Sequence, residues 1–435
     1  MNDLSRRGAQ ASAVKQLPED TLRGKVMRAG PFGVLDIGST KIACLIGRAE
    51  SDGRLRALGF GWQKSRGIKS GGIVDLDEAE KAIRAAVGAA EDTADMRLKS
   101  VYVNLSCGQP ESRLFNVQWP VDGRAVTADD IKRVVREARA RAASDGRATI
   151  HALPLSFSTD ETQGVLDPRG LFCDTLSAQL HVVDAGNAAL RTLSACLSRC
   201  ELDIATLVSA PMAAGLASLV GDERELGATV IDMGGGTTSL AVFSEGHVVH
   251  TAQIPLGGIH VTNDIARGFS TSVAHAERLK ALYGNCQGSP DDERELLPVP
   301  QVGEDEHQIA KMPRSMLISV IRPRIEEIFE LVKDRLETAG LGSAGGTRVV
   351  LTGGASQLGG VRELSTQILE RNVRLGRPGA MIGLPDSASA PNFASLVGLL
   401  AFAAGEGQTM QDINFESERV GGWFRGLVDF LKNRV

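Results

Sequence analysis

Two segments far apart in the chain share one pattern, in which an apolar strand ends at an aspartate, turns through glycines and hydroxyl residues, and resumes as a strand. The first is FGVLDIGSTKIACLIGRAE, residues 32–50, with the aspartate at Asp36. The second is ATVIDMGGGTTSLAVFSEGHVVH, residues 228–250, with the aspartate at Asp232. Each pattern predicts a β-hairpin. A single Asp-x-Gly turn is common, but the repeat predicts two related domains whose hairpin tips face a shared cleft.

The residue types at these tips are suited to phosphate. Glycine lets backbone N–H groups approach a phosphate, hydroxyls add donors, and an aspartate at a strand end can hold Mg²⁺ through its waters. A third segment, TRVVLTGGASQLGGVREL at residues 347–364, predicts a buried strand, a glycine turn and a helix that opens near Ser356. Such a turn lets a flat ring or a ribose lie against bare backbone. Taken alone, the third segment is equally compatible with an ordinary strand-to-helix turn.

Composition restricts the class of function. The chain has 435 residues, of which 43% are hydrophobic and 23% charged, enough for two or more domains with ordinary cores. A net charge of −5 provides no basic field, so a nucleic-acid partner is disfavoured. No run of about 18 apolar residues predicts a membrane span. The first thirty residues contain no apolar stretch long enough for a secretion signal, and we interpret residues 1–30 as a disordered arm.

The order of the motifs DIGSTK, DMGGGTTS, PLGG and TGGAS resembles the nucleotide-binding signature of the actin, Hsp70 and sugar-kinase superfamily. Within it, the chain most resembles the FtsA family of bacterial actin-like cell-division proteins, through DERELGATVIDMGGGTTSLAVF, PLGGIHVTNDIARGFSTSVAHAERLK and ASLVGLLAF. The resemblance implies an α/β fold: a two-lobed actin-like ATPase fold of duplicated ribonuclease H-like domains. A small αβ subdomain would be inserted in it, and an amphipathic helix would follow at the C-terminus.

The predicted division of the chain follows from these motifs. AVTADDIKRVVREARARAA predicts a helix with a Thr127 cap and an acidic first turn, flanked by strands, which is typical of a small αβ subdomain. The expected parts, in order, are the arm at 1–30, the first lobe core at 31–107 and 185–213, the inserted subdomain at 108–184, the second lobe core at 214–256 and 346–402, its small subdomain at 257–345, a flexible linker at 403–420 and an amphipathic helix at 421–435.

The resemblance further implies that ATP and Mg²⁺ bind between the lobes, with Asp36 and Asp232 flanking the Mg²⁺. The other implied nucleotide contacts are Gly38, Ser39, Thr40, Lys41, Gly234, Gly235, Gly236, Thr237 and Thr238 around the β- and γ-phosphates, Gly257 and Gly258 at the phosphate end, and Glu277, Lys280, Gly353, Gly354 and Ser356 beside the ribose and adenine. For Glu277 and Lys280, at i and i+3 on one helical face, the alternative is a solvated surface ion pair.

Hydrolysis is expected to be slow. In the chaperone and actin branches, a Glu or Gln at the start of the first connecting helix helps position the attacking water. The matching stretch here, LVSAPMAAGLASL, has Ser209 and Ala210 in that place. We therefore predict ATP binding with slow turnover and assign no catalytic residue. Two alternatives remain: a small-molecule kinase of the same superfamily, for which no motif provides the aspartate base, and an actin-like component of a type IV pilus machine.

The chain ends in an amphipathic segment, GGWFRGLVDFLKNRV, at residues 421–435. At about 100° per residue, its apolar side chains fall within an arc of roughly 160°, while Arg425 and Lys432 lie opposite. The apolar side chains are Trp423, Phe424, Leu427, Val428, Phe430 and Leu431. This pattern predicts a helix that lies on an anionic bilayer surface. The alternative is a helix docked on the protein's own core, against which the long polar linker argues.

The resemblance implies a polymer-forming protein that anchors the FtsZ ring to the cytoplasmic face of the bacterial inner membrane at the division site. The inserted subdomain would contribute to filament contacts with other copies of the chain and would bind later division proteins. The region 257–345 would dock the C-terminal peptide of FtsZ, and we place Arg324 and Glu327 in that contact.

Overall fold

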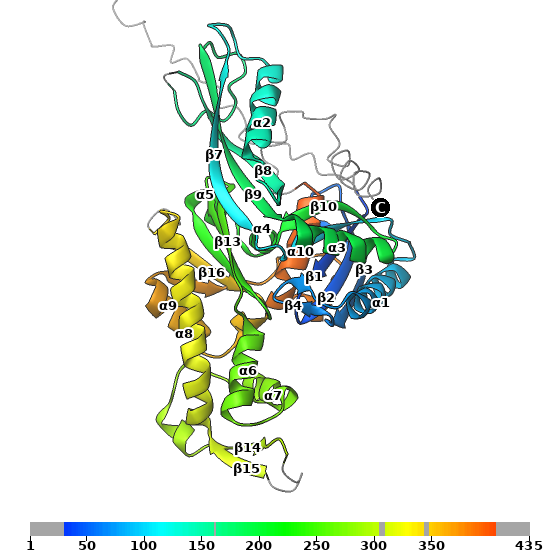
Figure 1. The fold of residues 1–435 in the computed structure, drawn as a ribbon, viewed down its shortest axis with the longest axis vertical. Coiled ribbons are helices and arrows are strands. Elements are labelled where there is room, and N and C mark those ends of the chain that lie inside the picture. Colours follow the sequence, from blue (N-terminus) through cyan, green and yellow to red (C-terminus); the bar gives the residue numbers. More distant parts are fainter. Residues whose placement is uncertain (1–29, 161, 304–308, 343–347, 406–435) are drawn as a thin grey trace, which may run out of the picture.

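The computed structural model describes residues 30–160, 162–303, 309–342 and 348–405. The predicted arm, most of the linker and the amphipathic segment at 421–435 lie outside these residues, so the expectations for them stay predictions. Figure 1 shows an elongated molecule, with the inserted subdomain, from β7 (Glu111–Pro120) to β9 (Thr175–Gly186), projecting at one end and the hairpin of β14 (Leu296–Pro300) and β15 (Ile309–Pro313) at the other.

The first hairpin is part of a sheet with the strand order β10-β6-β1-β2-β3. β1 pairs antiparallel with β2, and β2 with β3, whereas β6 is parallel to both β1 and β10. The strands are β1 (Phe32–Ile37), β2 (Lys41–Ala49), β3 (Leu55–Lys64), β6 (Ser100–Leu105) and β10 (Asp203–Ser209). The short strands β4 (Ile68–Lys69) and β5 (Gly72–Ile73) pair with each other beside this sheet.

The second hairpin occupies the same place in a second sheet, of order β13-β12-β11-β16-β17. β11, β12 and β13 form an antiparallel meander, and β16 and β17 extend it in parallel from β11. The strands are β11 (Ala228–Met233), β12 (Thr238–Ser244), β13 (His247–Ile254), β16 (Arg348–Thr352) and β17 (Asn372–Leu375). Both predicted hairpins are confirmed, and the matching strand orders agree with the predicted duplication.

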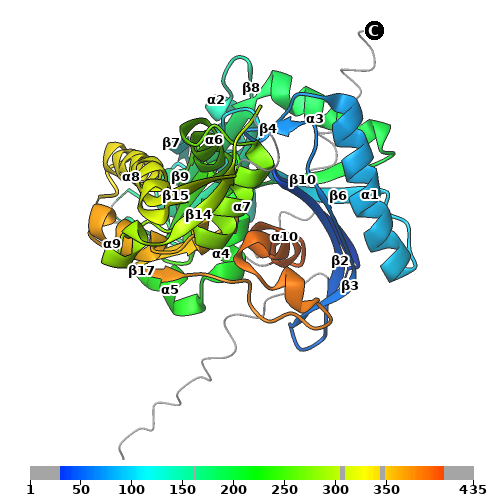
Figure 2. The ribbon, with the colours of Figure 1, turned by 90° about the horizontal axis from the view of Figure 1, so that it is seen from below.

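Helices α4 (Ala210–Ser218) and α10 (Ala394–Ala403) lie between the two sheets, as Figure 2 shows for α10. Every residue of α10 is buried, because both sheets and α4 surround it. The two helices approach closely at Gly398, where a Cβ atom would lie 1.7 Å from the carbonyl oxygen of Ala213. The domain boundary expected after residue 213 falls inside α4, which connects the lobes.

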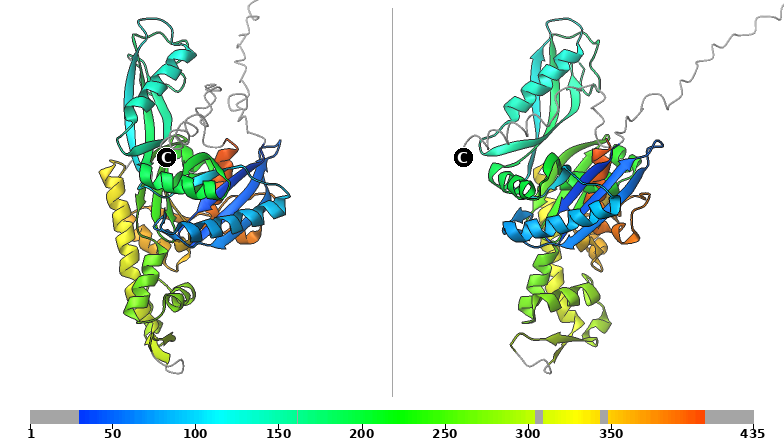
Figure 3. Two further views of the ribbon diagram at one scale, coloured as in Figure 1. Left: turned by 45° about the vertical axis from the view of Figure 1, so that its right-hand side comes forward. Right: turned by 90° about the vertical axis from the view of Figure 1, so that its right-hand side faces the viewer.

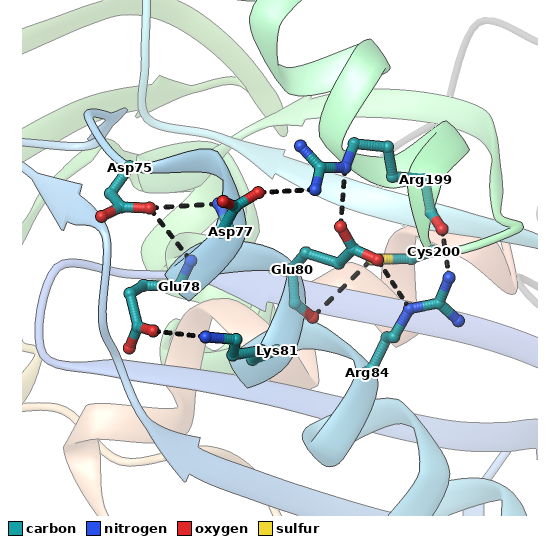
Figure 4. A network of polar contacts seen from close by, with 8 residues as sticks. All are labelled: Asp75, Asp77, Glu78, Glu80, Lys81, Arg84, Arg199 and Cys200. Carbon is teal, nitrogen blue, oxygen red and sulfur yellow. Dashed lines mark hydrogen bonds and ion pairs between the residues drawn. The ribbon is translucent and has the colours of Figure 1, made fainter.

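On its other face, the first sheet is covered by α1 (Leu76–Ala94) and α3 (Asn187–Arg199). Figure 4 shows the polar network that joins these helices. Arg199 contacts Asp77 and Glu80, each at 2.6 Å, and Arg84 donates to Glu80 at 3.0 Å. Because these side chains are mostly exposed, the network orients the helices and adds little stability.

The other face of the second sheet packs against α6 (Gly258–Gly268), α7 (Val273–Tyr283), α8 (Arg314–Thr338) and α9 (Val361–Leu369). The helix expected near Ser356 is wrong in detail, because a 3₁₀ turn, η3 (Gly354–Gln357), occupies that place. α9 begins only after Gly360, whose φ of +72° favours glycine.

Shorter elements complete the second lobe and its small subdomain: α5 (Gly221–Leu226), η2 (Pro290–Glu293), β14 (Leu296–Pro300), β15 (Ile309–Pro313), η4 (Asp386–Ala388) and η5 (Pro391–Phe393). Across the described ranges, no helix is both long and apolar enough to cross a bilayer.

The inserted subdomain has its own small core and projects from the rest of the molecule, as both views in Figure 3 show. Its sheet has the order β7-β9-β8, with strands β7 (Glu111–Pro120), β8 (Arg147–Ser158) and β9 (Thr175–Gly186). The predicted helix is confirmed as α2 (Ala128–Ala142). Thr127 caps it, and the Asp130 carboxylate accepts the Thr127 N–H in return at 2.9 Å.

Candidate functional site

Both hairpin tips line one cavity of about 460 Å³ between the lobes, a size typical of small-molecule sites. The cavity-lining residues that the sequence singled out are Asp36, Gly38, Ser39, Thr40, Lys41, Asp232, Gly234, Gly235, Gly236, Thr237, Gly258, Glu277, Lys280, Gly353 and Gly354. The structure thus brings together side chains and backbone from five separate stretches of sequence, namely 36–41, 232–237, 258, 277–280 and 353–354.

The two tips have the same backbone turn and touch each other. Gly38 N–H donates to the carbonyl of Lys41 at 2.9 Å, and Gly234 N–H donates to that of Thr237 at 2.9 Å. A Cβ atom on Gly235 would lie 2.3 Å from the methyl group of Thr40. Glycine at this position therefore allows the second tip to approach the first.

The aspartate of the first tip has a cation supplied by its own motif. Lys41 Nζ lies 2.9 Å from Asp36 Oδ2, and the two side chains are only 13% and 10% exposed. Lys41 Nζ also lies 4.4 Å from the ring centroid of Phe393, in cation–π contact. This tip therefore presents a nearly buried ion pair to the cavity.

The aspartate of the second tip has no such partner. Asp232 Oδ2 accepts a hydrogen bond from Ser395 Oγ at 2.7 Å. Burial raises the pKa of Asp232 to about 6, against the lowering effect of the Ser395 hydrogen bond. The charge of nearby Asp36 raises this pKa further, while Lys41 lowers it. The second tip therefore carries a carboxylate whose negative charge is poorly compensated.

The turn after β16 closes around this carboxylate. Gly353 has a φ of +85°, and a Cβ atom there would lie 2.3 Å from Asp232 Oδ1. Glycine is required at this position for both reasons.

Three of the residues expected to contact the nucleotide do not line the cavity and lie behind its wall instead. Thr238 is fully buried, and its hydroxyl has no hydrogen-bond partner among the residues that the structure describes. Gly257 packs against the second tip, since a Cβ atom there would lie 2.6 Å from the Gly234 carbonyl oxygen. Ser356 Oγ donates to the Gly353 carbonyl at 2.7 Å, which stabilises the turn.

Glu277 and Lys280 form the expected i, i+3 pair at 2.7 Å on the cavity wall. Lys280 is only 16% exposed, so this is not a freely solvated pair. Its ammonium group also donates to the Gly258 carbonyl at 3.0 Å and to Thr262 Oγ1 at 2.8 Å. The lysine thereby ties α7 to the start of α6.

Several residues that line the cavity were not predicted from the sequence. Gly71, in the turn between β4 and β5, donates its N–H to Ser39 Oγ at 3.0 Å, and the sequence signal was the Ser-Gly-Gly run at 70–72. Gln253 of the second lobe donates to the Ser106 carbonyl of the first at 2.9 Å. Asn392 enters from η5 and Ser395 from the first turn of α10, for which the sequence carried no signal beyond an apolar helix.

Small residues occupy the start of α4, as the sequence indicated. Ser209 and Ala210 line the cavity, and the Ser209 N–H donates to His151 Nε2 of the inserted subdomain at 3.0 Å. Burial lowers the pKa of His151 to about 4, so the ring is a neutral acceptor. Among the described residues that line the cavity, the carboxylates are Asp36, Asp232 and Glu277, and none comes from α4.

Arg324 and Glu327 lie on α8, outside the cavity. Arg324 binds Asp264 of α6 through two contacts of 2.6 and 3.2 Å, and it also pairs with Glu327. The arginine therefore holds α8 against α6, whatever else it binds.

Comparison with known proteins identifies the family. The family model described as cell division protein FtsA matches residues 229–398, and that of the SHS2 domain inserted in FtsA matches residues 107–184. The cell division protein FtsA of Rhizobium meliloti (strain 1021) is 43% identical over 419 residues, which cover 92% of this chain and 95% of that protein. The chain belongs to the FtsA family.

The FtsA of Escherichia coli (strain K12) is 32% identical over 414 residues, covering 92% of this chain and 96% of that protein. The SHS2 match coincides with the projecting αβ subdomain, which identifies the insert as the one found in FtsA proteins.

Two solved structures share the fold beyond the FtsA family. The PilM–PilN type IV pilus biogenesis complex gives a TM-score of 0.62 at 18% identity, covering 87% of this chain and 99% of that chain. MreB5 of Spiroplasma citri bound to ADP gives 0.53 at 14% identity, covering 88% of this chain and 98% of that chain. The expected actin-like, two-lobed fold with an inserted subdomain is confirmed.

Proposed function

We propose that the chain binds ATP with Mg²⁺ in the interlobe cavity and works as a polymer-forming, membrane-attached adaptor of bacterial cell division. The observation that carries this proposal is that both hairpin tips, one from each equivalent sheet, line the same cavity. Membership of the FtsA family favours cell division over a small-molecule kinase or a pilus component.

The cavity residues fit a nucleotide. Backbone N–H groups in the glycine turns of both tips suit phosphate oxygens, and the Gly353–Gly354 turn leaves room for a ribose or base. The MreB5 structure in the comparison holds ADP, which agrees with a nucleotide site in this fold.

The same residues fit Mg²⁺ in the way this ion is usually bound. Asp36 and Asp232 would hold it through its waters, because Mg²⁺ sites commonly use one or two carboxylates together with substrate phosphates. Where bound, Mg²⁺ would neutralise part of the phosphate charge. Within the described residues, no group of three or more His, Cys, Asp and Glu side chains could hold a metal alone. We therefore expect Mg²⁺ to bind with the nucleotide and only weakly without it.

Turnover is expected to be slow. A water-positioning carboxylate or amide from α4 would be needed for efficient hydrolysis, and Ser209 and Ala210 provide neither. ATP then acts mainly as a conformational ligand that favours closure of the lobes and filament contacts. A turnover rate like that of ordinary kinases would contradict this part of the proposal.

The adaptor role rests on family membership and on the predicted C-terminal segment. Residues 421–435 would lie on the anionic cytoplasmic face of the inner membrane at the division site. A single short helix binds marginally, so a filament of many copies would strengthen attachment through effective concentration. The small subdomain around α8 would bind the C-terminal peptide of FtsZ, with Arg324 and Glu327 at the contact. The inserted subdomain would contact other copies and later division proteins.

Co-sedimentation with anionic liposomes, ATP and purified FtsZ tests the adaptor role, with the full chain compared with a chain ending at Val420. We expect only the full chain to carry FtsZ into the pellet. If FtsZ stays in the supernatant with both chains, the adaptor proposal is wrong. Liposomes of neutral lipid are the control for the electrostatic part of membrane binding.

A further inference from the structure

The carboxylate of Asp232 is held by a helix that lies far away in the sequence. Ser395 is in the first turn of α10, and its hydroxyl donates to Asp232 Oδ2 at 2.7 Å. The alternative acceptor, the Ala210 carbonyl oxygen, is farther away, at 3.5 Å. A hydroxyl has one proton to donate, and the shorter bond to a charged acceptor is the stronger.

In the described part of the chain, the hydroxyl of Ser395 makes no hydrogen bond within α10. α10 begins after Phe393, and no side chain caps it. A serine inside a helix usually bonds to the backbone one turn earlier, but this hydroxyl reaches another element instead.

The position of Ser395 is tightly determined. All residues of α10 are buried, and the close contact between Gly398 and Ala213 fixes the helix against α4. A donor on such a rigid element can hold its acceptor in one orientation. In the described part of the chain, no other side chain donates to Asp232, and Oδ1 accepts no hydrogen bond.

We propose that Ser395 is a positioning residue for Mg²⁺-dependent nucleotide binding: it holds one oxygen of Asp232 and so fixes the orientation of the carboxylate, whose other oxygen lies against Gly353 of the cavity wall. The proposal rests on the proposed function, in which Asp232 faces the ion. Partners of this kind orient metal ligands, and their loss commonly weakens metal binding about 10- to 100-fold.

The test measures the affinity for a fluorescent ATP analogue in EDTA and in excess Mg²⁺, so that the readout is the gain in affinity that Mg²⁺ confers. In Ser395→Ala and in the near-isosteric Ser395→Cys, we expect this gain to fall about tenfold, with the affinity in EDTA changed less than about twofold. Ser395→Thr keeps the hydroxyl and should retain most of the gain. Ser365→Ala is the matched control, because Ser365 is a buried helical serine on α9 that bonds only to a backbone carbonyl.

The possible results distinguish the positioning role of Ser395 from the proposed function itself. An unchanged Mg²⁺ gain in both Ser395→Ala and Ser395→Cys would overturn the positioning role while leaving the proposed function intact. An equal loss in Ser365→Ala would also overturn it, since the effect would then be general to buried serines. A wild-type chain that binds no nucleotide in either condition would refute the proposed function and, with it, the role of Ser395.

Discussion

The two hairpin tips have the same turn but different electrostatics. Lys41 and Thr237 occupy equivalent places, since the carbonyl of each accepts the glycine N–H that closes its turn. In the first tip this residue supplies a cation to Asp36 at 2.9 Å. In the second tip it supplies none, and Asp232 depends on a neutral hydroxyl from α10. A repeated motif therefore specifies the backbone around the cavity, while the charge balance of each aspartate is set separately.

This difference predicts opposite effects on stability. The first aspartate belongs to a nearly buried ion pair, so removing one partner leaves the other uncompensated. The second is a partly buried carboxylate without a cation beside it, so removing its charge should raise the free energy of unfolding.

Asp36→Asn breaks the ion pair and should lower the free energy of unfolding by about 3–5 kcal/mol, because Lys41 is left buried without a counter-ion. Urea denaturation without nucleotide measures the change. Lys41→Met should cost a similar amount, and the double variant should cost clearly less than the sum of the two. If the loss of stability in the double variant equals the sum of the two single losses, Asp36 and Lys41 do not act as a pair.

Gly353→Ala should destabilise the second tip by about 2 kcal/mol or more, because the new methyl group meets Asp232 Oδ1 and the backbone has a positive φ. The same urea experiment checks this value. In Asp232→Ala, which removes the facing carboxylate, the steric part of the cost should shrink. An unchanged cost would show that backbone conformation alone accounts for it.

Asp232→Asn should raise the free energy of unfolding by about 1–2 kcal/mol at pH 7.5 in EDTA. Burial raises the pKa of Asp232 to about 6 in the folded chain, above its usual unfolded value of about 4. The folded state therefore binds the proton more tightly, and this group makes the wild type less stable as pH rises from about 4 to about 6.

Thermal melting across this pH range compares the two chains. The difference in melting temperature between Asp232→Asn and the wild type should grow over this interval and stay constant above it. A difference that is independent of pH would contradict the assigned charge cost.

Thr237→Lys places in the second tip the cation that the first tip has. It should lower the pKa of Asp232 and stabilise the chain at pH 7.5 by less than about 1 kcal/mol, because Thr237 is partly exposed to the cavity. The pH dependence of melting should flatten between pH 4 and 6. Thr237→Met, of similar length but uncharged, is the control and should leave the wild-type pH dependence in place.

The local features of the site were predictable from the sequence. Both hairpins and the Gly353 turn follow from short-range patterns of apolar and glycine residues, as the Thr127-capped helix of the inserted subdomain follows from its capping residues. The start of α9 was not predictable in this way, because a 3₁₀ turn occupies the place of Ser356 and α9 begins only after Gly360.

Residues whose role depends on tertiary contacts could not be found in this way. Ser395 lies within ASLVGLLAF, which reads as an ordinary core helix, and only the packing of α10 between the lobes brings its hydroxyl to Asp232. The ion pair between Lys41 and Asp36 was not predicted either, because the resemblance implied only a phosphate contact for Lys41. Pairing across a long sequence separation, as between Ser395 and Asp232, carries no local signal.

The central claim is that the two tips hold one Mg²⁺-nucleotide complex jointly. Calorimetric titration of ATP with Mg²⁺ into the wild type, Asp36→Asn and Asp232→Asn tests it most directly, at a temperature where all three chains are folded. We expect either substitution to weaken binding about tenfold or more, and EDTA to weaken wild-type binding to a similar level. Wild-type affinity in both variants would contradict the claim.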